Sequence, residues 1–475
     1  MALDLPVDEE VSAVFGRPLA GQTLEEVAAA SNVMFVRSQI QVAFDNVRAT
    51  GMRLVAIEAL QRFGWPVLRQ LAHRDAVPII RVPGEPGLGI AAKRNLLGFS
   101  EQKVASAVGL STDDFTAFER GLKQIPFRRI ERLAQVLSVD LDAKVGTDSS
   151  EEKLAVRLRE FADSLEKIKL SPTLVLHLSE SAWVISKQAK LQAQFQSDPG
   201  SNTRQMGFIP SAKYGPPPYR WGYKLAHKTR QLLGLTQSEP IMSLRVLVED
   251  RLRIPVVQMD LPTQFAGATV SNGSARGIVL NLQGHNMNPW IRRNTLAHEV
   301  GHLLWDPEDK LNALRVDTFS ELEHSQELIK DPVEARANAF AAELLAPRDA
   351  VLTVCANASS DGDAIRSVCQ TFGISPSAAR YQIQNARRDG VELTMPQFTI
   401  DPSDDWKIAE NFATDYFPPA PDVPVNRRGL FAYWVALSAK ERLISFDTAS
   451  SYLGLECRVI DAQINGILSL FGEKR

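Results

Sequence analysis

The chain contains little cysteine and no long apolar run, and both shortages restrict what it can be. Its three cysteines, Cys355, Cys369 and Cys457, are widely spaced and form no C-x-x-C pair. This arrangement indicates neither a disulfide framework nor a structural zinc site. No apolar run approaches the ~18 residues of a membrane-spanning helix, and the first residues, M-A-L-D-L-P, lack the basic start of a signal peptide. We therefore predict a cytoplasmic protein.

Neither basic nor acidic residues are in large excess. The formal net charge of −3 over 475 residues gives no global attraction to nucleic acid or to an anionic membrane. Any DNA binding would therefore have to be local. Apolar residues make up 44% and charged residues 23% of the chain, which is typical of a globular protein. The length is sufficient for about three domains.

Histidine is also scarce, but two of the seven histidines form a pattern with chemical meaning. His298 and His302 lie four residues apart in T-L-A-H-E-V-G-H. Positions i and i+4 share one face of a helix, so both imidazoles can bind one metal ion. Glu299 would then face the open coordination position and take a proton from the attacking water, as in the H-E-x-x-H zinc motif. The alternative is a surface helix with two solvated histidines.

The residues around this motif favour the metal site. Asn288 and Pro289 are a cap residue and a proline at the first position of the predicted helix. The short run from Gly277 to Leu282 is typical of a strand. An exposed strand edge beside a metal-binding helix can hold an extended peptide. The pattern therefore indicates a peptidase.

A catalytic zinc ion normally has three protein ligands, and the best third candidate is Glu334. Pro332 begins a second predicted helix, and Glu334 lies in its first turn, where the helix dipole also favours a carboxylate. Two interpretations stay open at this point. Glu334 either completes the metal site or only stabilises the start of the helix.

The run from Arg253 to Pro347 resembles the ImmA/IrrE family of metallopeptidases. The matching pieces, in order, are R-I-P-V-V-Q-M, a middle strand, R-N-T-L-A-H-E-V-G-H-L-L, and E-A-R-A-N-A-F-A-A-E-L-L-A-P. The family pattern places its third ligand four residues before an Asn, which is Glu334 here. The long charged loop from Asp306 to Lys330 departs from the pattern. Proteolytic members of this family cleave helix-turn-helix repressors after stress or DNA damage, so the resemblance implies such a substrate.

The implied mechanism is peptide hydrolysis at one Zn²⁺ per chain, held by His298, His302 and Glu334. Glu299 accepts the proton of the attacking water and later returns it to the leaving amine. The sequence does not identify the second oxyanion donor. The candidates for this role are Tyr381 and His324, and the candidates for orienting the ligands are Thr295 and Asn338, either of which could instead pack or cap.

A second unit, from Ile90 to Val139, resembles the helix-turn-helix of the Xre-type repressors, whose second helix enters the major groove. The candidate DNA contacts are Gln102, Lys103, Thr112, Asp113, Thr116, Lys123 and Arg128. The departure is at Asp113 and Asp114, because carboxylates beside phosphates reduce affinity. DNA binding and protein docking therefore remain alternative roles for this unit.

We predict a mainly α fold with a small β-sheet (α+β), in which a zincin-like metallopeptidase is joined to helix-turn-helix and helical accessory domains. The predicted order is a helical N-terminal region (1–85), an Xre-like helix-turn-helix (86–145), a helical connector (146–195), a linker (196–219), an ImmA/IrrE-like metallopeptidase with a helical cap (220–395) and a helical C-terminal domain (396–475). Within the first region, the run from Gln39 to Phe63 has a helical pattern. The C-terminal domain is either a packing domain or a third helix-turn-helix.

The favoured function is a zinc endopeptidase that cleaves a helix-turn-helix repressor or another partner protein in a stress, phage or mobile-element response. One alternative is a DNA-binding transcription regulator that uses the peptidase fold as a sensor or docking domain. Another is an antitoxin-like or defence component that acts by binding a partner. DNA as a partner and the oligomeric state are left open.

Overall fold

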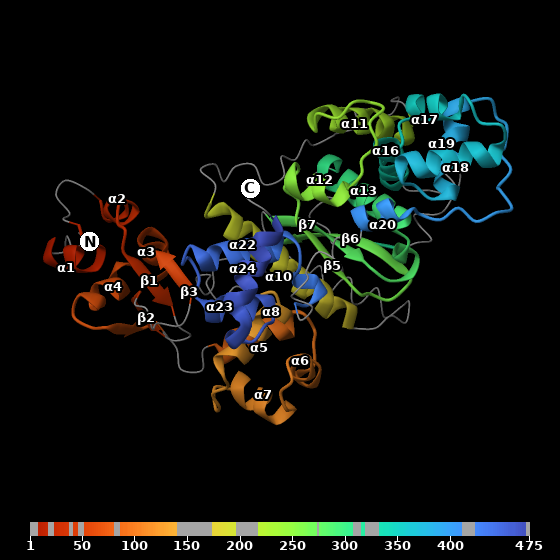
Figure 1. Ribbon diagram of the computed structural model, residues 1–475. Helices are drawn as coiled ribbons and strands as arrows, with labels where there is room; N and C mark the ends of the chain where they lie inside the picture. The colour runs from red at the N-terminus through yellow and green to blue at the C-terminus, as the bar shows by residue number, and fades with distance from the viewer. Residues whose placement is uncertain are drawn as a thin grey trace. The chain divides into compact units, whose positions relative to one another are not determined.

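The computed structural model describes residues 8–17, 23–37, 41–45, 52–79, 86–139, 173–195, 217–272, 275–306, 315–318, 332–410 and 423–471. Over these residues the chain is mainly helical with two small sheets, which confirms the predicted fold class. Two compact units are present (Figure 1), one of residues 1–160, 419–427 and 431–475 and the other of residues 161–418 and 428–430. None of the described helices is long and apolar enough to cross a membrane.

The N-terminal part of the first unit contains a four-stranded antiparallel sheet in the order β3-β1-β2-β4, so the prediction of a helical N-terminal region was wrong. The strands are β1 (Met34–Arg37), β2 (Gln41–Phe44), β3 (Met52–Val55) and β4 (Ala76–Pro78). Its helices are α1 (Asp8–Phe15), α2 (Leu24–Ala29), α3 (Ala56–Phe63), α4 (Trp65–Leu68) and the 3-10 helix η1 (Arg69–Ala72). Strands of three or four residues are too short for an alternating pattern to be distinguished from a helical one. The helix predicted from Gln39 therefore begins only at Ala56.

Four short helices follow in the same unit. They are α5 (Gly87–Leu96), α6 (Glu101–Ala107), α7 (Thr112–Glu119) and α8 (Phe127–Val136). Gly109 has φ +67° in the turn between α6 and α7, a conformation that glycine adopts without strain. Ser111 then caps α7 by accepting a hydrogen bond from the backbone N–H of Asp114 at 3.2 Å. A tight turn thus joins α6 to α7, as the sequence pattern predicted.

The C-terminal helices also belong to this unit and contact α8. They are α22 (Leu430–Lys440), α23 (Phe446–Leu453) and α24 (Ile460–Phe471), with the 3-10 helices η4 (Val425–Arg427) and η5 (Cys457–Val459). Gln135 of α8 donates a hydrogen bond from Nε2 to the backbone carbonyl of Ser451 in α23 at 3.2 Å. The end of the chain therefore packs on a helix more than 300 residues earlier in the sequence.

The second unit is built around a sheet in the order β5-β7-β6-β8. Its strands are β5 (Val256–Met259), β6 (Phe265–Asn272), β7 (Ala275–Asn281) and β8 (Arg315–Thr318), with β5 parallel to β7 and the other pairs antiparallel. A Cβ at Gly267 of β6 would lie 3.1 Å from Thr295 of α13 (Pro289–Trp305). A Cβ at Gly277 of β7 would instead lie 2.8 Å from Ile185 of α10 (Thr173–Ala193). Since Gly277 pairs with Val270, whose side chain alternates with that at 267, α13 and α10 cover opposite faces of the sheet.

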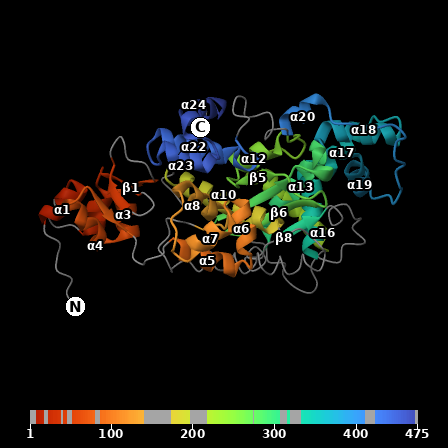
Figure 2. The same cartoon turned by 90° about the horizontal axis from the view of Figure 1, so that it is seen from below.

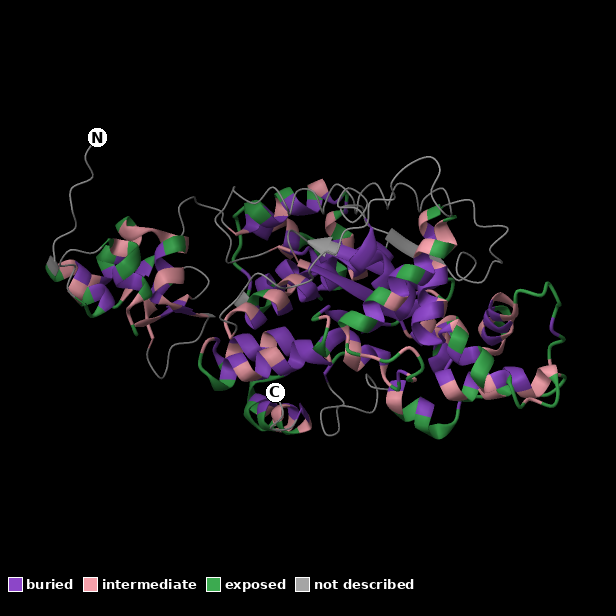
Figure 3. Ribbon diagram, turned by 90° about the horizontal axis from the view of Figure 1, so that it is seen from above, coloured by how far each residue is buried: buried purple, intermediate pink, exposed green. Residues whose placement is uncertain are grey.

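Further helices complete this unit, within which the residues of α13 are almost entirely buried (Figure 3). They are α11 (Pro218–Leu232), α12 (Leu244–Asp250), η3 (Gly284–Met287), α16 (Pro332–Leu345), α17 (Arg348–Cys355), α18 (Asp361–Phe372), α19 (Pro376–Arg387) and α20 (Asp404–Glu410). Helix α16 packs against α11 and also against α13, beside which it lies in Figure 2. A Cβ at Gly222 of α11 would lie only 2.4 Å from the carbonyl oxygen of Arg336, so glycine is needed for this close approach of α11 and α16.

We predict that the interaction of His227 in α11 with Glu343 in α16 stabilises the protein more at lower pH. Its Nε2 lies 2.8 Å from Glu343 Oε1 and its Nδ1 lies 2.6 Å from Gln237 Oε1. The hydrogen bond to Glu343 raises the pKa of His227 above 6.5, and partial burial opposes this effect. A raised pKa contributes stability that is fully present below about pH 6.5 and is lost as the pH rises through the folded value.

The His227→Gln substitution should therefore lower the free energy of unfolding, and the decrease should be larger at pH 6 than at pH 9. Urea denaturation followed by tryptophan fluorescence at a series of pH values measures this difference. A difference that is the same at every pH would contradict the assignment.

Candidate metal centre

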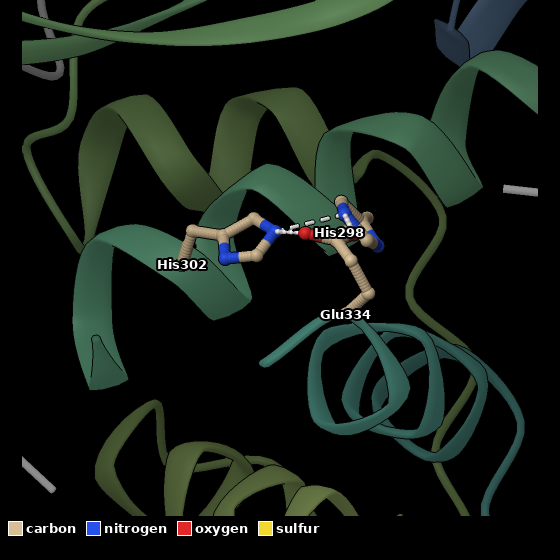
Figure 4. A group of neighbouring side chains, drawn as sticks. All are labelled: His298, His302 and Glu334. Atoms are coloured by element: carbon tan, nitrogen blue, oxygen red, sulfur yellow. Dashed lines mark hydrogen bonds and ion pairs between the residues drawn. The ribbon is translucent and has the colours of Figure 1, made fainter. Parts of the chain in front are cut away.

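Three predicted ligands converge where α13 meets α16 (Figure 4). His298 and His302 lie one turn apart on α13, and Glu334 lies in the first turn of α16. The two Nε2 atoms are 2.9 Å apart, and Glu334 Oε2 lies 3.1 Å from His298 Nε2. Glu334 Oε1 lies 3.6 Å from His302 Nε2. All three residues are buried, and their ligand atoms lie within 4.8 Å of one another.

The local sequence explains why α13 presents the two histidines here. The helix begins at Pro289, and the side chain of Asn288 accepts a hydrogen bond from the N–H of Trp290 at 2.9 Å. Its apolar side belongs to the main core of the unit. A Cβ at Gly301 would lie 2.8 Å from Phe340 Cδ1, so Gly301 allows α16 to pack closely. This packing brings Glu334 to the histidines.

The donor set fits a zinc ion. Two imidazole nitrogens and one carboxylate oxygen are the ligands of one common type of catalytic zinc site, which leaves one coordination position open. The ligand atoms converge inside the protein on a common point, and Glu334 is 7% exposed. A carboxylate buried against two imidazoles is stabilised by a shared cation. The structure thus favours Glu334 as a ligand over a residue that only stabilises the start of α16.

Strand β6 positions Glu299. The Oγ1 of Thr269 donates a hydrogen bond to Glu299 Oε2 at 2.7 Å. A Cβ at Gly267 would lie 2.9 Å from Glu299 Oε1, so the strand backbone passes directly beside the carboxylate. Positions 267 and 269 share one face of the strand because side chains alternate. Neither residue was predicted from the sequence, although a glycine in a strand often marks the close approach of another group.

Two further residues missed by the sequence analysis support His302. Asp306, at the C-terminal end of α13, places Oδ2 at 2.9 Å from His302 Nδ1. Arg336 of α16 forms an ion pair with Asp306 Oδ1. The available signal was the spacing of four residues between His302 and Asp306, which places them on one helix face.

The other candidate residues have different environments. The hydroxyl of Thr295 donates to Asn286 Oδ1 at 2.9 Å, so it joins α13 to η3 and does not contact a ligand imidazole. The side-chain N and O of Asn338, one turn beyond Glu334, are buried and have no hydrogen-bond partner in the described part of the chain. Tyr381 lies on α19 and is 40% exposed. His324 lies outside the described residues, as do residues 196–216 of the predicted linker and 146–172 of the predicted connector.

The predicted peptide-holding strand, Gly277 to Leu282, is not an edge strand. Most of it is β7, which is hydrogen-bonded to β5 on one side and to β6 on the other. Its consecutive buried residues are typical of a central strand, whereas an exposed edge shows alternation. Among the described strands, β5 and β8 form the edges of this sheet. Strand β8 comes from the segment that connects α13 to α16.

The basic side chains predicted to contact DNA interact with other groups of the protein. Lys123 Nζ lies 2.5 Å from Asp114 Oδ1, and this contact lowers the pKa of the Asp114 carboxyl. Lys103 Nζ lies 4.8 Å from the centroid of the Phe99 ring, and burial lowers its pKa. Arg128 lies 3.2 Å from Asp447 Oδ1 and also contacts Ser450, Leu455 and Cys457.

Of the uncharged and acidic candidates, Gln102 lies on α6, and Thr112, Asp113 and Thr116 lie on α7. Thr116 donates its hydroxyl hydrogen to Glu101, whereas Gln102, Thr112 and Asp113 are exposed. The basic candidates Lys123 and Arg128 are exposed as well, but they pair with Asp114 and Asp447. The exposed candidates on α7 itself are neutral or acidic. This composition is unfavourable next to DNA phosphates, which attract basic groups.

Comparison with known proteins agrees with the site geometry. Residues 250–384 match the family model of Peptidase_M78, the IrrE N-terminal-like domain. No curated protein matches the chain. The matched segment contains the whole sheet, α13 and α16, and therefore all three candidate ligands and Glu299. The candidate metal centre thus lies in the segment that is similar to the IrrE N-terminal-like domain of Peptidase_M78, and this match supports the resemblance of this part of the chain to the ImmA/IrrE family.

Proposed function

We propose that this protein is a zinc-dependent endopeptidase that cleaves a specific partner protein. The observation that carries the proposal is the convergence of His298, His302 and Glu334 inside a metallopeptidase-type domain. When bound, a zinc ion would act as a Lewis acid that polarises the scissile carbonyl and lowers the pKa of water. The two imidazoles and the Glu334 carboxylate would hold it.

Glu299 is the general base in this proposal. It follows His298 on α13, and the hydrogen bond from Thr269 fixes one of its oxygens. The carboxylate accepts a proton from the attacking water and delivers it to the leaving amine, which cannot depart as an anion at neutral pH. The protein therefore supplies both proton transfers through one side chain.

Asn338 is our candidate for an additional polar contact in the site. Its amide lies one turn beyond Glu334 and has no partner in the described structure. Buried amides normally form hydrogen bonds. A ligand imidazole or the carbonyl oxygen of a bound peptide would satisfy it. Tyr381 and His324 remain weaker candidates for the oxyanion donor, since nothing described brings either to the ligands.

The substrate is proposed to be a helix-turn-helix repressor, as the ImmA/IrrE resemblance implies. An extended segment of the repressor would pair with the edge strand β8, because β7 is already hydrogen-bonded to a strand on each side. The neutral and acidic exposed side chains of α7 favour a protein-docking role for the helices from α5 to α8 over DNA binding. A narrow substrate range follows from this requirement for docking.

Comparison of protein N-termini in cells that carry either wild-type protein or the Glu299→Gln variant tests this function. We expect one or a few cleavage sites under DNA damage that depend on Glu299, and little activity on casein. The new N-termini should map to exposed loops or helix ends of a repressor. An absence of differential cleavage across several stresses would favour a regulatory role, and cleavage of many proteins would contradict narrow specificity.

A further inference from the structure

A buried chain of charges extends from the metal centre across the two helices that form it. His302 Nδ1 lies 2.9 Å from Asp306 Oδ2, and Arg336 forms an ion pair with the other oxygen of Asp306. The side chains of His302, Asp306 and Arg336 are only 1%, 3% and 7% exposed. Arg336 follows Glu334 by two residues on α16. This series of side chains therefore begins at the candidate ligand His302 and ends at Arg336, which lies on the same helix as the candidate ligand Glu334.

The position of Asp306 is unfavourable unless it has a function. It caps the C-terminal end of α13, where its backbone N–H donates to the carbonyl of His302 at 2.9 Å. The C-terminal end of a helix carries a partial negative charge, so a carboxylate there reduces stability. Burial adds a desolvation cost, which the Arg336 guanidinium offsets. This placement instead gives His302 a fixed acceptor.

An acceptor on Nδ1 determines which imidazole nitrogen can bind a metal ion. A neutral imidazole carries its proton on one nitrogen and a lone pair on the other. An ionised carboxylate can only accept, so Asp306 requires the proton to be on Nδ1 and leaves the lone pair on Nε2. That Nε2 faces His298 and Glu334. The carboxylate thus selects the tautomer that the site needs.

We propose that Asp306 and Arg336 are positioning residues of the metal centre. Asp306 fixes the tautomer and the ring orientation of His302. Arg336 fixes Asp306 and joins the end of the histidine helix to the helix of Glu334. This inference rests on the proposed function, because it assumes that the site binds zinc.

Zinc affinity, measured by competition with a chromophoric chelator, tests the inference without reference to activity. The Asp306→Asn variant keeps the size of the side chain, but its amide can rotate and donate to Nδ1, which places the imidazole proton on the wrong nitrogen. We expect zinc to bind about 10–100-fold more weakly, the usual effect of losing such a partner. The Arg336→Gln variant should show a smaller loss in the same direction. Cobalt substituted for zinc should show altered visible absorption in Asp306→Asn.

The matched control is Glu249→Gln, which removes a buried ion pair with Arg245 inside α12, where the partner atoms lie 3.2 Å apart. This variant should lower the melting temperature without changing zinc affinity or the cobalt spectrum. Wild-type affinity in both Asp306→Asn and Arg336→Gln would overturn the proposal, as would an equal loss in the control. If Asp306→Asn does not fold, Arg336→Gln alone decides the outcome. Failure of the wild-type protein itself to bind zinc would refute the proposed function instead.

Discussion

Replacement of His298 or His302 by alanine is expected to remove zinc from the purified protein, whereas the wild type should hold about one equivalent per chain. Each substitution leaves one imidazole and one carboxylate, and two protein ligands do not retain zinc against buffer and competing proteins. Both rings are fully buried at the site, so no neighbouring solvent-exposed group takes their place easily. Elemental analysis after dialysis measures the zinc content directly.

The control for this prediction is His227→Ala, because His227 lies in the same unit and contacts a buried glutamate without being one of the three clustered ligands. It should keep its zinc. Glu334→Ala then separates the two interpretations of that residue. Loss of zinc identifies it as the third ligand, and retention would show that it only stabilises the start of α16. Full occupancy in either histidine variant would refute the site.

Glu299→Gln is expected to keep the metal and to reduce hydrolysis of the substrate by at least ~10²-fold, the usual scale for losing a general base. Glutamine has nearly the same shape, and its Oε1 can still accept the hydrogen bond that Thr269 donates at 2.7 Å. It cannot accept a proton from water. The expected loss therefore falls on kcat and leaves zinc content unchanged.

The matching variant for Glu299 is Thr269→Val, which keeps the shape of the strand side chain and removes only its hydrogen bond. Its effect should be smaller than that of Glu299→Gln, because the base is still present but less well oriented. Single-turnover rates with the cleaved partner protein, together with zinc analysis of each variant, give the comparison. Unchanged rates in Glu299→Gln would exclude Glu299 as the base.

The two histidine ligands could be predicted because their geometry is local, whereas Glu334 lies on a different helix and was chosen as the third ligand through the family resemblance. His298 and His302 share a helix face by spacing alone, and a proline two residues before Glu334 indicated the start of its helix. By contrast, the contacts of Glu299 with β6 and of Asp306 with α16 join segments separated by 30 residues. Such contacts depend on tertiary packing and are not encoded in any local period.

Strand pairing limited the sequence analysis in a similar way. The run from Gly277 was correctly interpreted as a strand, but its place in the sheet depends on β5 and β6, which are separate segments. The N-terminal sheet was missed because its strands are short and their partners are set by pairing, as for Phe35 with Phe44 and Leu54. The ion pair of Arg128 could not be predicted either, because its partner Asp447 lies 319 residues away in the sequence.

The connection between α13 and α16 contains β8 and should therefore tolerate insertions and deletions poorly. Surface connections usually tolerate insertions and deletions. Here, the connection between α13 and α16 contributes the edge strand β8 to the sheet and precedes the helix of Glu334 in the chain. A deletion on either side of β8 would pull a strand out of register or shift the third ligand. Epitope tags and engineered cleavage sites are therefore expected to be tolerated better outside residues 307–331 than within them.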